Sequence, residues 1–128
     1  MALTSTFITN PVKTIIVNQT ASTSASGVGD NNVAGGPAYL ISATINNSSY
    51  GTVVYTSLYN ATSATKGTTD SDIILRGHNS ASKTYTFHPP YYFSNGISMV
   101  TSTDKGQAGT TAPSTPPAVT LVLSTSAT

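Results

Sequence analysis

Residues 39–46 read YLISATIN, and this stretch decides the fold class. Tyr39, Ile41, Ala43 and Ile45 recur at every second position, and Ser42, Thr44 and Asn46 occupy positions between them. A period of two residues is that of a β-strand with one buried face, because successive side chains point to opposite sides of a sheet. The stretch therefore predicts a strand that buries one face. That face is expected to consist of Tyr39, Ile41, Ala43 and Ile45.

Working outward, six further segments have a similar composition, rich in Val, Ile, Thr and Tyr, with turn residues between most of them. The expected strands cover residues 7–17, 52–60, 72–76, 83–87, 96–102 and 118–124. Pro11 makes the first an edge strand or two short pieces, because proline cannot donate to a β-ladder. The turn at 47–51 predicts a hairpin between its flanking strands. About seven short strands without a persistent helical period predict an all-β fold, an antiparallel β-sandwich or jelly roll.

The length of 128 residues suits a single β domain. We expect an extended N-terminal arm or loop over about residues 1–37 and a core over about 38–124. Residues 18–37 and 103–117 offer little to bury, and the second stretch is stiffened by prolines. Long segments of this kind are either functional or mobile. They are expected to reach neighbouring subunits or to form mobile tips.

The composition excludes several classes of partner. Only 7% of residues are charged and the net charge is +1, so the five scattered cations cannot form the basic stripe of a nucleic-acid-binding or polybasic membrane-binding protein. Ser and Thr make up 41 of the 128 residues, and a surface with so little charge favours association. There is no cysteine, hence no disulfide. Residues 1–6 lack the pattern of a secretory signal, so we expect assembly in a cytoplasm.

No pattern of catalytic residues stands out. Asp70 and Asp72 lie in a polar turn, where two carboxylates are expected to be solvated rather than poised as an acid–base pair. His78 and His88 fall on different loops and do not supply the three or four ligands that zinc requires. The sequence therefore predicts a protein that is not an enzyme, with no catalytic residue, no cofactor and no resident metal.

The most informative segment for binding is residues 83–100, KTYTFHPPYYFSNGISMV. Its two prolines are expected to end the strand at 83–87 and to stiffen a corner. The aromatic run that follows forms either a platform for a partner protein or a sugar, or an anchor packed under the corner; aromatic residues are enriched at interface cores. The candidate interface consists of Tyr91, Tyr92, Phe93, Pro89, Pro90, Phe7 and Ile8.

Four stretches, YLISATINNSS, VVYTSLYNATSAT, KTYTFHPPYYFSNGISMV and AVTLVLS, carry a resemblance to a known class of protein. They lie within residues 39–124, and the chain from Tyr39 to Leu123 resembles the small all-β virion structural proteins of tailed phages, of the capsid decoration (cement) type. In such proteins a proline-containing corner is followed by an aromatic residue, a short polar pair, Gly and an apolar strand, as in residues 93–97.

The resemblance implies a β-sandwich that is often trimeric and that stabilises the phage head. The implied partners are the major capsid protein and copies of the chain itself, and the implied location is the capsid surface of the virion, assembled in the host cytoplasm. No catalytic residue is implied. The alternative is a head-fibre or tail-fibre component, or a carbohydrate-binding module that reads a host-surface glycan through Tyr91, Tyr92 or Tyr50.

Overall fold

The computed structural model describes the backbone of residues 12–18 and residues 31–65, 67–106, 111 and 113–124 in full. This part of the chain contains seven strands and no helix, which confirms the all-β prediction. The strands are β1 (Val12–Asn18), β2 (Ala38–Asn46), β3 (Val54–Asn60), β4 (Ile73–Gly77), β5 (Ser82–Phe93), β6 (Ile97–Ser102) and β7 (Ala118–Ser124). The expected strand segment 7–11 lies outside the described residues.

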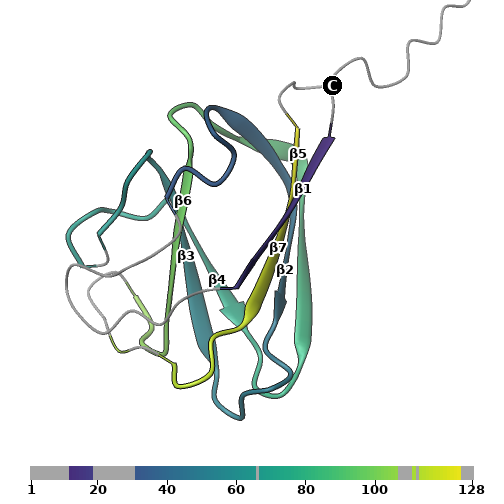
Figure 1. Ribbon diagram of the computed structural model, residues 1–128, viewed down its shortest axis with the longest axis vertical. Coiled ribbons are helices and arrows are strands. Elements are labelled where there is room, and N and C mark those ends of the chain that lie inside the picture. The colour runs from purple at the N-terminus through teal and green to yellow at the C-terminus, as the bar shows by residue number, and fades with distance from the viewer. Residues whose placement is uncertain (1–11, 19–30, 66, 107–110, 112, 125–128) are drawn as a thin grey trace, which may run out of the picture.

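The strands form two antiparallel sheets that face each other, as Figure 1 shows. One sheet has the order β1-β7-β2-β5 and the other the order β4-β3-β6. The chain crosses from one sheet to the other after β2, β4, β5 and β6. Burial of apolar side chains between the sheets is the main force that holds such a sandwich together. The largest core side chains include Leu40, Ile45, Leu58, Phe93, Ile97, Met99, Leu121 and Leu123.

Among the described residues, this strand order is that of a jelly roll without its second strand. A jelly roll is a double sheet of eight strands in two Greek keys. When its second strand is omitted and the rest are renumbered, the two sheets take the orders found here. Residues 31–34 lie beside β6, where the omitted strand would pair: the Val33 amide donates to the Ile97 carbonyl oxygen at 2.8 Å. The prediction of a sandwich or jelly roll is therefore confirmed.

The predicted hairpin between 39–46 and 52–60 is wrong. β2 belongs to the four-stranded sheet, whereas β3 pairs with β4 and β6 in the other. The connection at 47–53 therefore arches across the end of the sandwich. The residues of this turn are compatible with either an arch or a hairpin. Which of the two forms depends on where the side chains of the next strand are buried. β3 has buried side chains on both of its faces, because Leu58 packs in the main core and Tyr59 in a second, smaller cluster.

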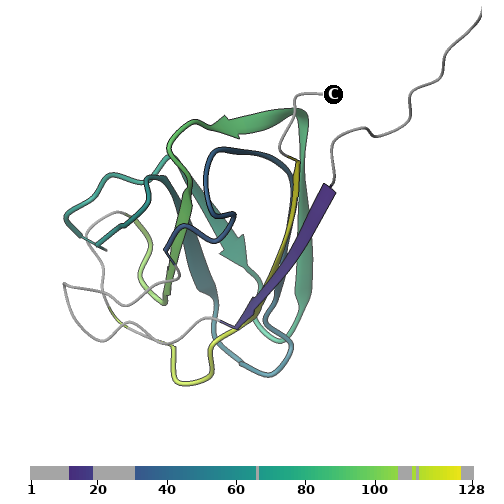
Figure 2. The ribbon, with the colours of Figure 1, turned by 45° about the horizontal axis from the view of Figure 1, so that its top comes forward.

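β5 continues through the two prolines that were expected to end it. Residues 82–86 pair with one half of β2 and residues 91–93 with the other. Residues 87–90 bulge out between these two paired parts, opposite Ile41, and contain a cis peptide bond between His88 and Pro89. Proline is tolerated here because β5 is an edge strand and the bulge makes no ladder bonds. In Figure 2, β5 bends at this level and its end crosses the top of the sandwich.

A second irregularity changes which face of β2 is buried. The register of β2 shifts at Ile41 against both of its neighbours, so that the alternation reverses there. Ala43 and Ile45 face the core as predicted. On the N-terminal side of the shift, Leu40 faces the core in place of Tyr39 and Ile41. Tyr39 and Ile41 are only partly buried. The prediction that these two residues belong to the buried face is therefore wrong.

Candidate interaction surfaces

The outer face of the four-stranded sheet carries no charged side chain at the described positions of β2, β5 and β7. The register aligns these outward positions in rows across the three strands. In one of these rows the hydroxyl groups of Thr44 and Thr84 lie 2.8 Å apart and are hydrogen-bonded. The other outward side chains of this face are Tyr39, Ser42, Asn46, Ser82, Thr86, Tyr92, Ala118, Thr120 and Val122. The face is therefore a neutral surface of hydroxyl, amide and aromatic groups.

One end of this face is aromatic. Tyr39 lies opposite Tyr92 in the β2–β5 ladder, and their rings stack with centroids 4.5 Å apart. Cross-strand aromatic pairs of this kind stabilise a sheet and hold both rings in place. Tyr92 remains 47% exposed, the highest value among the large hydrophobic side chains of the described residues. We call Tyr39, Tyr92 and the neighbouring Tyr91, whose side chain lies on the inner side of β5 with Phe93, the aromatic corner.

The aromatic run proposed as an interface divides between surface and core. Tyr91 is 39% exposed, whereas Phe93 is completely buried. The rings of Tyr91 and Phe93 meet edge to face at 4.9 Å, so the core residue supports the surface residue. The sequence allowed this run to be either a binding platform or a packed anchor. Phe93 is a packed anchor, whereas its neighbours Tyr91 and Tyr92 remain exposed and available to a partner.

The remaining predicted interface residues are less informative. Pro89 is exposed and Pro90 half-buried, both in the β5 bulge beside the aromatic corner. Phe7 and Ile8 lie outside the described residues. The structure therefore brings Pro89 and Pro90 together with Tyr91 and Tyr92 along one edge of the sheet.

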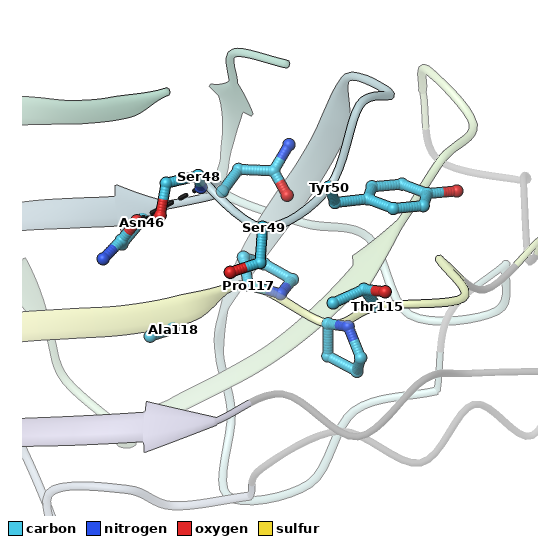
Figure 3. A pocket seen from close by; sticks show the side chains of 9 residues that line it. Asn46, Ser48, Ser49, Tyr50, Thr115, Pro117 and Ala118 are labelled. Atoms are coloured by element: carbon cyan, nitrogen blue, oxygen red, sulfur yellow. Dashed lines mark hydrogen bonds between the residues drawn. The ribbon is translucent and has the colours of Figure 1, made fainter. Parts of the chain in front are cut away.

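A pocket of about 210 Å³ lies at the opposite end of the sheet. Two segments line it, the arch after β2 and the approach to β7, and Figure 3 shows Tyr50 on the first and Thr115 on the second. None of the lining residues is charged. They are Asn46, Asn47, Ser48, Ser49, Tyr50, Thr115, Pro116, Pro117 and Ala118. β2 separates the pocket from the aromatic corner by about 25 Å, at roughly 3.3 Å per strand residue.

The conformation of the arch depends on Asn47, which is 1% exposed. Its side-chain amide donates to the carbonyl oxygens of Thr52 at 2.8 Å and His78 at 3.1 Å. Its backbone amide donates to the Ala81 carbonyl oxygen at 2.9 Å. One buried side chain thus joins the arch to the loop between β4 and β5, and this fixes one wall of the pocket.

The candidates for chemistry do not assemble into a reactive site. One carboxylate oxygen of Asp72 accepts the Asn60 backbone amide at 2.7 Å, which makes this residue part of a loop structure, and Asp70 is exposed. The ring of His78 lies 3.1 Å from the Arg76 guanidinium, and His88 is exposed in the bulge. Among the described residues, no three His, Cys, Asp or Glu side chains are grouped as a metal site would require.

One titratable group has a shifted pKa. Burial raises the pKa of the Tyr59 phenol above its ordinary value of 10.0, and the nearby Ser57 side chain partly opposes the shift. Tyr59 packs with Ala64 and Val100 on the outer side of the three-stranded sheet. Because it lies in this second cluster and not in either candidate surface, we assign it a structural role.

Sequence reasoning pointed to Tyr91 and Tyr92 but missed both Tyr39 and the pocket. Tyr39 was assigned to the core, because a simple alternation takes no account of the register shift at Ile41. The pocket was missed because its walls come from distant parts of the chain, 46–50 and 115–118. The signals available were the proline pair at 116–117 and the asparagine pair at 46–47, both typical of loops with fixed geometry.

The part of the chain that the structure describes forms no helix, and so none that could span a membrane. Comparisons with protein-family models, with curated proteins and with solved structures found no match to this chain. The geometry of the sheet face, the aromatic corner and the pocket is therefore the basis for the functional proposals that follow.

Proposed function

We propose that this protein is a non-enzymatic virion structural protein, a capsid decoration (cement) protein of a tailed phage. It docks on the phage head through the outer face of the four-stranded sheet and the aromatic corner. The observation that carries this proposal is the neutral sheet face, which ends in the stacked and exposed pair Tyr39 and Tyr92. The sequence resemblance supports the choice of the virion as the assembly.

The chemistry of this face suits a protein–protein interface. The buried centres of interfaces are depleted of charged residues and enriched in tyrosine, because aromatic rings bury a large area at little entropic cost. The face has both properties at its described positions. The hydroxyl groups of Thr84 and Thr86 are exposed along the sheet edge and are suited to hydrogen bonds with a partner.

The strand order gives support of a weaker kind. Jelly rolls occur in viral capsid and lectin domains. Because one fold serves many functions, the strand order alone does not identify a function. The main support for the proposal is the chemistry of the sheet face. The jelly-roll order is compatible with both a capsid role and a sugar-binding role.

The proposed mechanism is mechanical. Copies of the chain, as trimers, contact the major capsid protein at many equivalent positions on the head. A weak contact for each copy becomes strong retention when several copies are linked, because the second contact forms at a high effective concentration. The shell is then held together across the boundaries between capsid subunits.

The test is electron microscopy of virions with and without the gene, followed by binding of the purified protein to heads that lack it. We expect a regular pattern of density on the head to disappear and the particles to become less resistant to heat. We expect Tyr92→Ala to weaken binding at least tenfold, which corresponds to about 1.4 kcal/mol. The control is Ile74→Thr, an exposed residue on the opposite sheet, which should bind like wild type.

Two results would overturn the proposal. Intact head density with missing tail or fibre density, together with lost adsorption, would move the protein to host attachment. Equal binding by wild type and Tyr92→Ala would show that the aromatic corner is not the docking surface.

A further inference from the structure

The pocket at the far end of the sheet is a concave site that shares only Asn46 and Ala118 with the outer face of the sheet and lies apart from the aromatic corner. It lies between the arch at 46–50 and the segment 115–118, while the aromatic corner lies at the other end of β2. Loops that cluster at one end of a rigid sandwich are common places for binding sites. The docking proposal leaves this concave site without a role.

We infer that this pocket binds a single neutral sugar residue of a glycan. The first reason is its charge: the lining consists of amide, hydroxyl, proline and aromatic groups, and no described lining residue carries a charge. A pocket for phosphate, sulfate or a carboxylated ligand would be expected to hold a cation or converging backbone amides. A neutral ligand rich in hydroxyl groups fits such a lining.

The second reason is a fixed donor–acceptor arrangement at one end of the pocket. The backbone amide and the hydroxyl group of Ser48 approach Asn46 Oδ1 at 3.2 Å and 2.6 Å. A backbone amide can only donate, so this contact determines which side-chain atom of Asn46 is the oxygen. Asn46 Nδ2 is left as a donor, with no acceptor among the described residues, and the Ser48 hydroxyl keeps its lone pairs as acceptors. A sugar hydroxyl can both donate and accept a hydrogen bond, so it can bind to the Asn46 donor and to the Ser48 acceptor.

The third reason is the aromatic ring at the other end. Figure 3 shows Tyr50 and Asn46 at opposite ends of the lining, with Ser49 and Pro117 between them. Tyr50 is half-buried and packs against the main core, so its ring is held in place. The face of an aromatic ring carries partial negative charge, which attracts the slightly positive C–H groups of a sugar ring.

The size and stiffness of the site are consistent with one sugar ring. Its volume of about 210 Å³ is below the roughly 300–1,000 Å³ of sites for drug-sized ligands. Asn47 anchors one wall, and Pro116 and Pro117 fix the backbone of the other. Walls held in this way reduce the entropic cost of binding, because little has to be ordered when the ligand arrives.

The experiment is a titration of the isotope-labelled full-length protein, followed by NMR of its backbone amides. The probes are glucose, galactose, mannose and N-acetylglucosamine, with sorbitol as an open-chain polyol control and glucuronate as a charged control. We expect at least one neutral sugar to shift the amides of residues 46–50 and 118 saturably, with a Kd of about 1–10 mM. Sorbitol and glucuronate should produce no saturable change.

Variants connect the signal to the pocket. Tyr50→Ala should weaken sugar binding at least tenfold, whereas Tyr50→Phe, which keeps the ring, should bind within about threefold of wild type. If Tyr50→Ala does not fold, Asn46→Ala changes an exposed residue and serves the same purpose. Tyr92→Ala should leave sugar binding unchanged, which separates this test from that of capsid docking.

Three outcomes would overturn the inference. They are the absence of a saturable shift with all four neutral sugars, shifts that sorbitol reproduces, and shifts located at Tyr91 and Tyr92 instead of the arch.

Discussion

Tyr59 lies at the end of β3, and its side chain is fully buried against the outer side of the three-stranded sheet. Its packing partners are small or branched, Ala64 and Val100, with Ala61 at the edge of the cluster. A phenol in such surroundings is much better accommodated in its neutral form than as an anion. The residue therefore links the stability of the fold to alkaline pH.

The sign of this link follows from the raised pKa of Tyr59. Below pH 10.0 the phenol is neutral in both the folded and the unfolded chain, and its contribution to stability is complete. Above that pH the unfolded chain loses the proton first, so stability falls as pH rises through the higher folded-state pKa. We expect the free energy of unfolding to fall more steeply in wild type than in Tyr59→Phe between about pH 9 and pH 11.

Urea unfolding at several pH values measures this difference. Other tyrosines contribute equally to both proteins, so the difference between the two slopes isolates Tyr59. Tyr92→Phe is the matched control, because Tyr92 is exposed, and it should follow wild type. Parallel pH profiles for wild type and Tyr59→Phe would contradict the prediction.

Among the elements, the strands show what local pattern reasoning can and cannot give. Each of the seven expected segments overlaps an observed strand, because β-propensity and the turn residues between segments are local properties. The irregularities are not local. Whether Ile41 forms a bulge depends on the simultaneous match of β2 to β5 and β7, and whether Pro89 interrupts a strand depends on that strand lying at an edge.

β3 and β6 carry a polar pair inside the sandwich. Thr56 and Thr101 are cross-strand partners, both completely buried, and their hydroxyl groups are hydrogen-bonded at 2.8 Å. A buried hydroxyl that loses its partner costs about 1–3 kcal/mol, whereas replacing both partners by apolar groups of the same shape is nearly neutral. We expect Thr56→Val and Thr101→Val each to destabilise by about 1–2 kcal/mol, and the double variant by less than either.

Chemical denaturation of the four proteins gives the coupling energy between the two threonines directly. Thr44 and Thr84 form the same kind of pair on the exposed face, and they serve as the control. Replacing one of them should cost little, because water satisfies the other hydroxyl. Additive effects of the two core substitutions would show that the buried hydroxyls do not depend on each other.

At the scale of the whole molecule, the two candidate surfaces differ in how far the sequence could predict them. Most of the aromatic corner comes from one continuous run of the sequence, so the sequence alone indicates Tyr91 and Tyr92 as interface candidates. The pocket needs residues 46–50 and 115–118 side by side, and only the three-dimensional path of the chain brings them together. The sequence shows that the chain has few charged residues. It does not show that the described positions of one sheet face lack charged side chains altogether.

That neutral face leads to a prediction about salt. Screening weakens contacts between exposed charges, with a Debye length of about 10 Å at 0.1 M and about 3 Å at 1 M. Since the proposed docking face carries no charge at its described positions, binding to heads should change less than about threefold between roughly 0.05 M and 0.5 M sodium chloride. A co-sedimentation assay measures this, with Tyr92→Ala as the weak-binding reference. A loss of binding of tenfold or more would indicate that charged groups elsewhere carry the contact.

The position of β7 has a consequence for the order of events during synthesis. The last strand of the described residues, β7, fits between β1 and β2, near the middle of the four-stranded sheet, and Leu121 and Leu123 complete the core from there. While the ribosome has not yet released this strand, β1 and β2 have no common neighbour and the sheet cannot close. Folding must therefore wait until translation has passed residue 124. The nascent chain has to remain soluble without its tertiary structure, and its abundance of serine and threonine is suited to that interval.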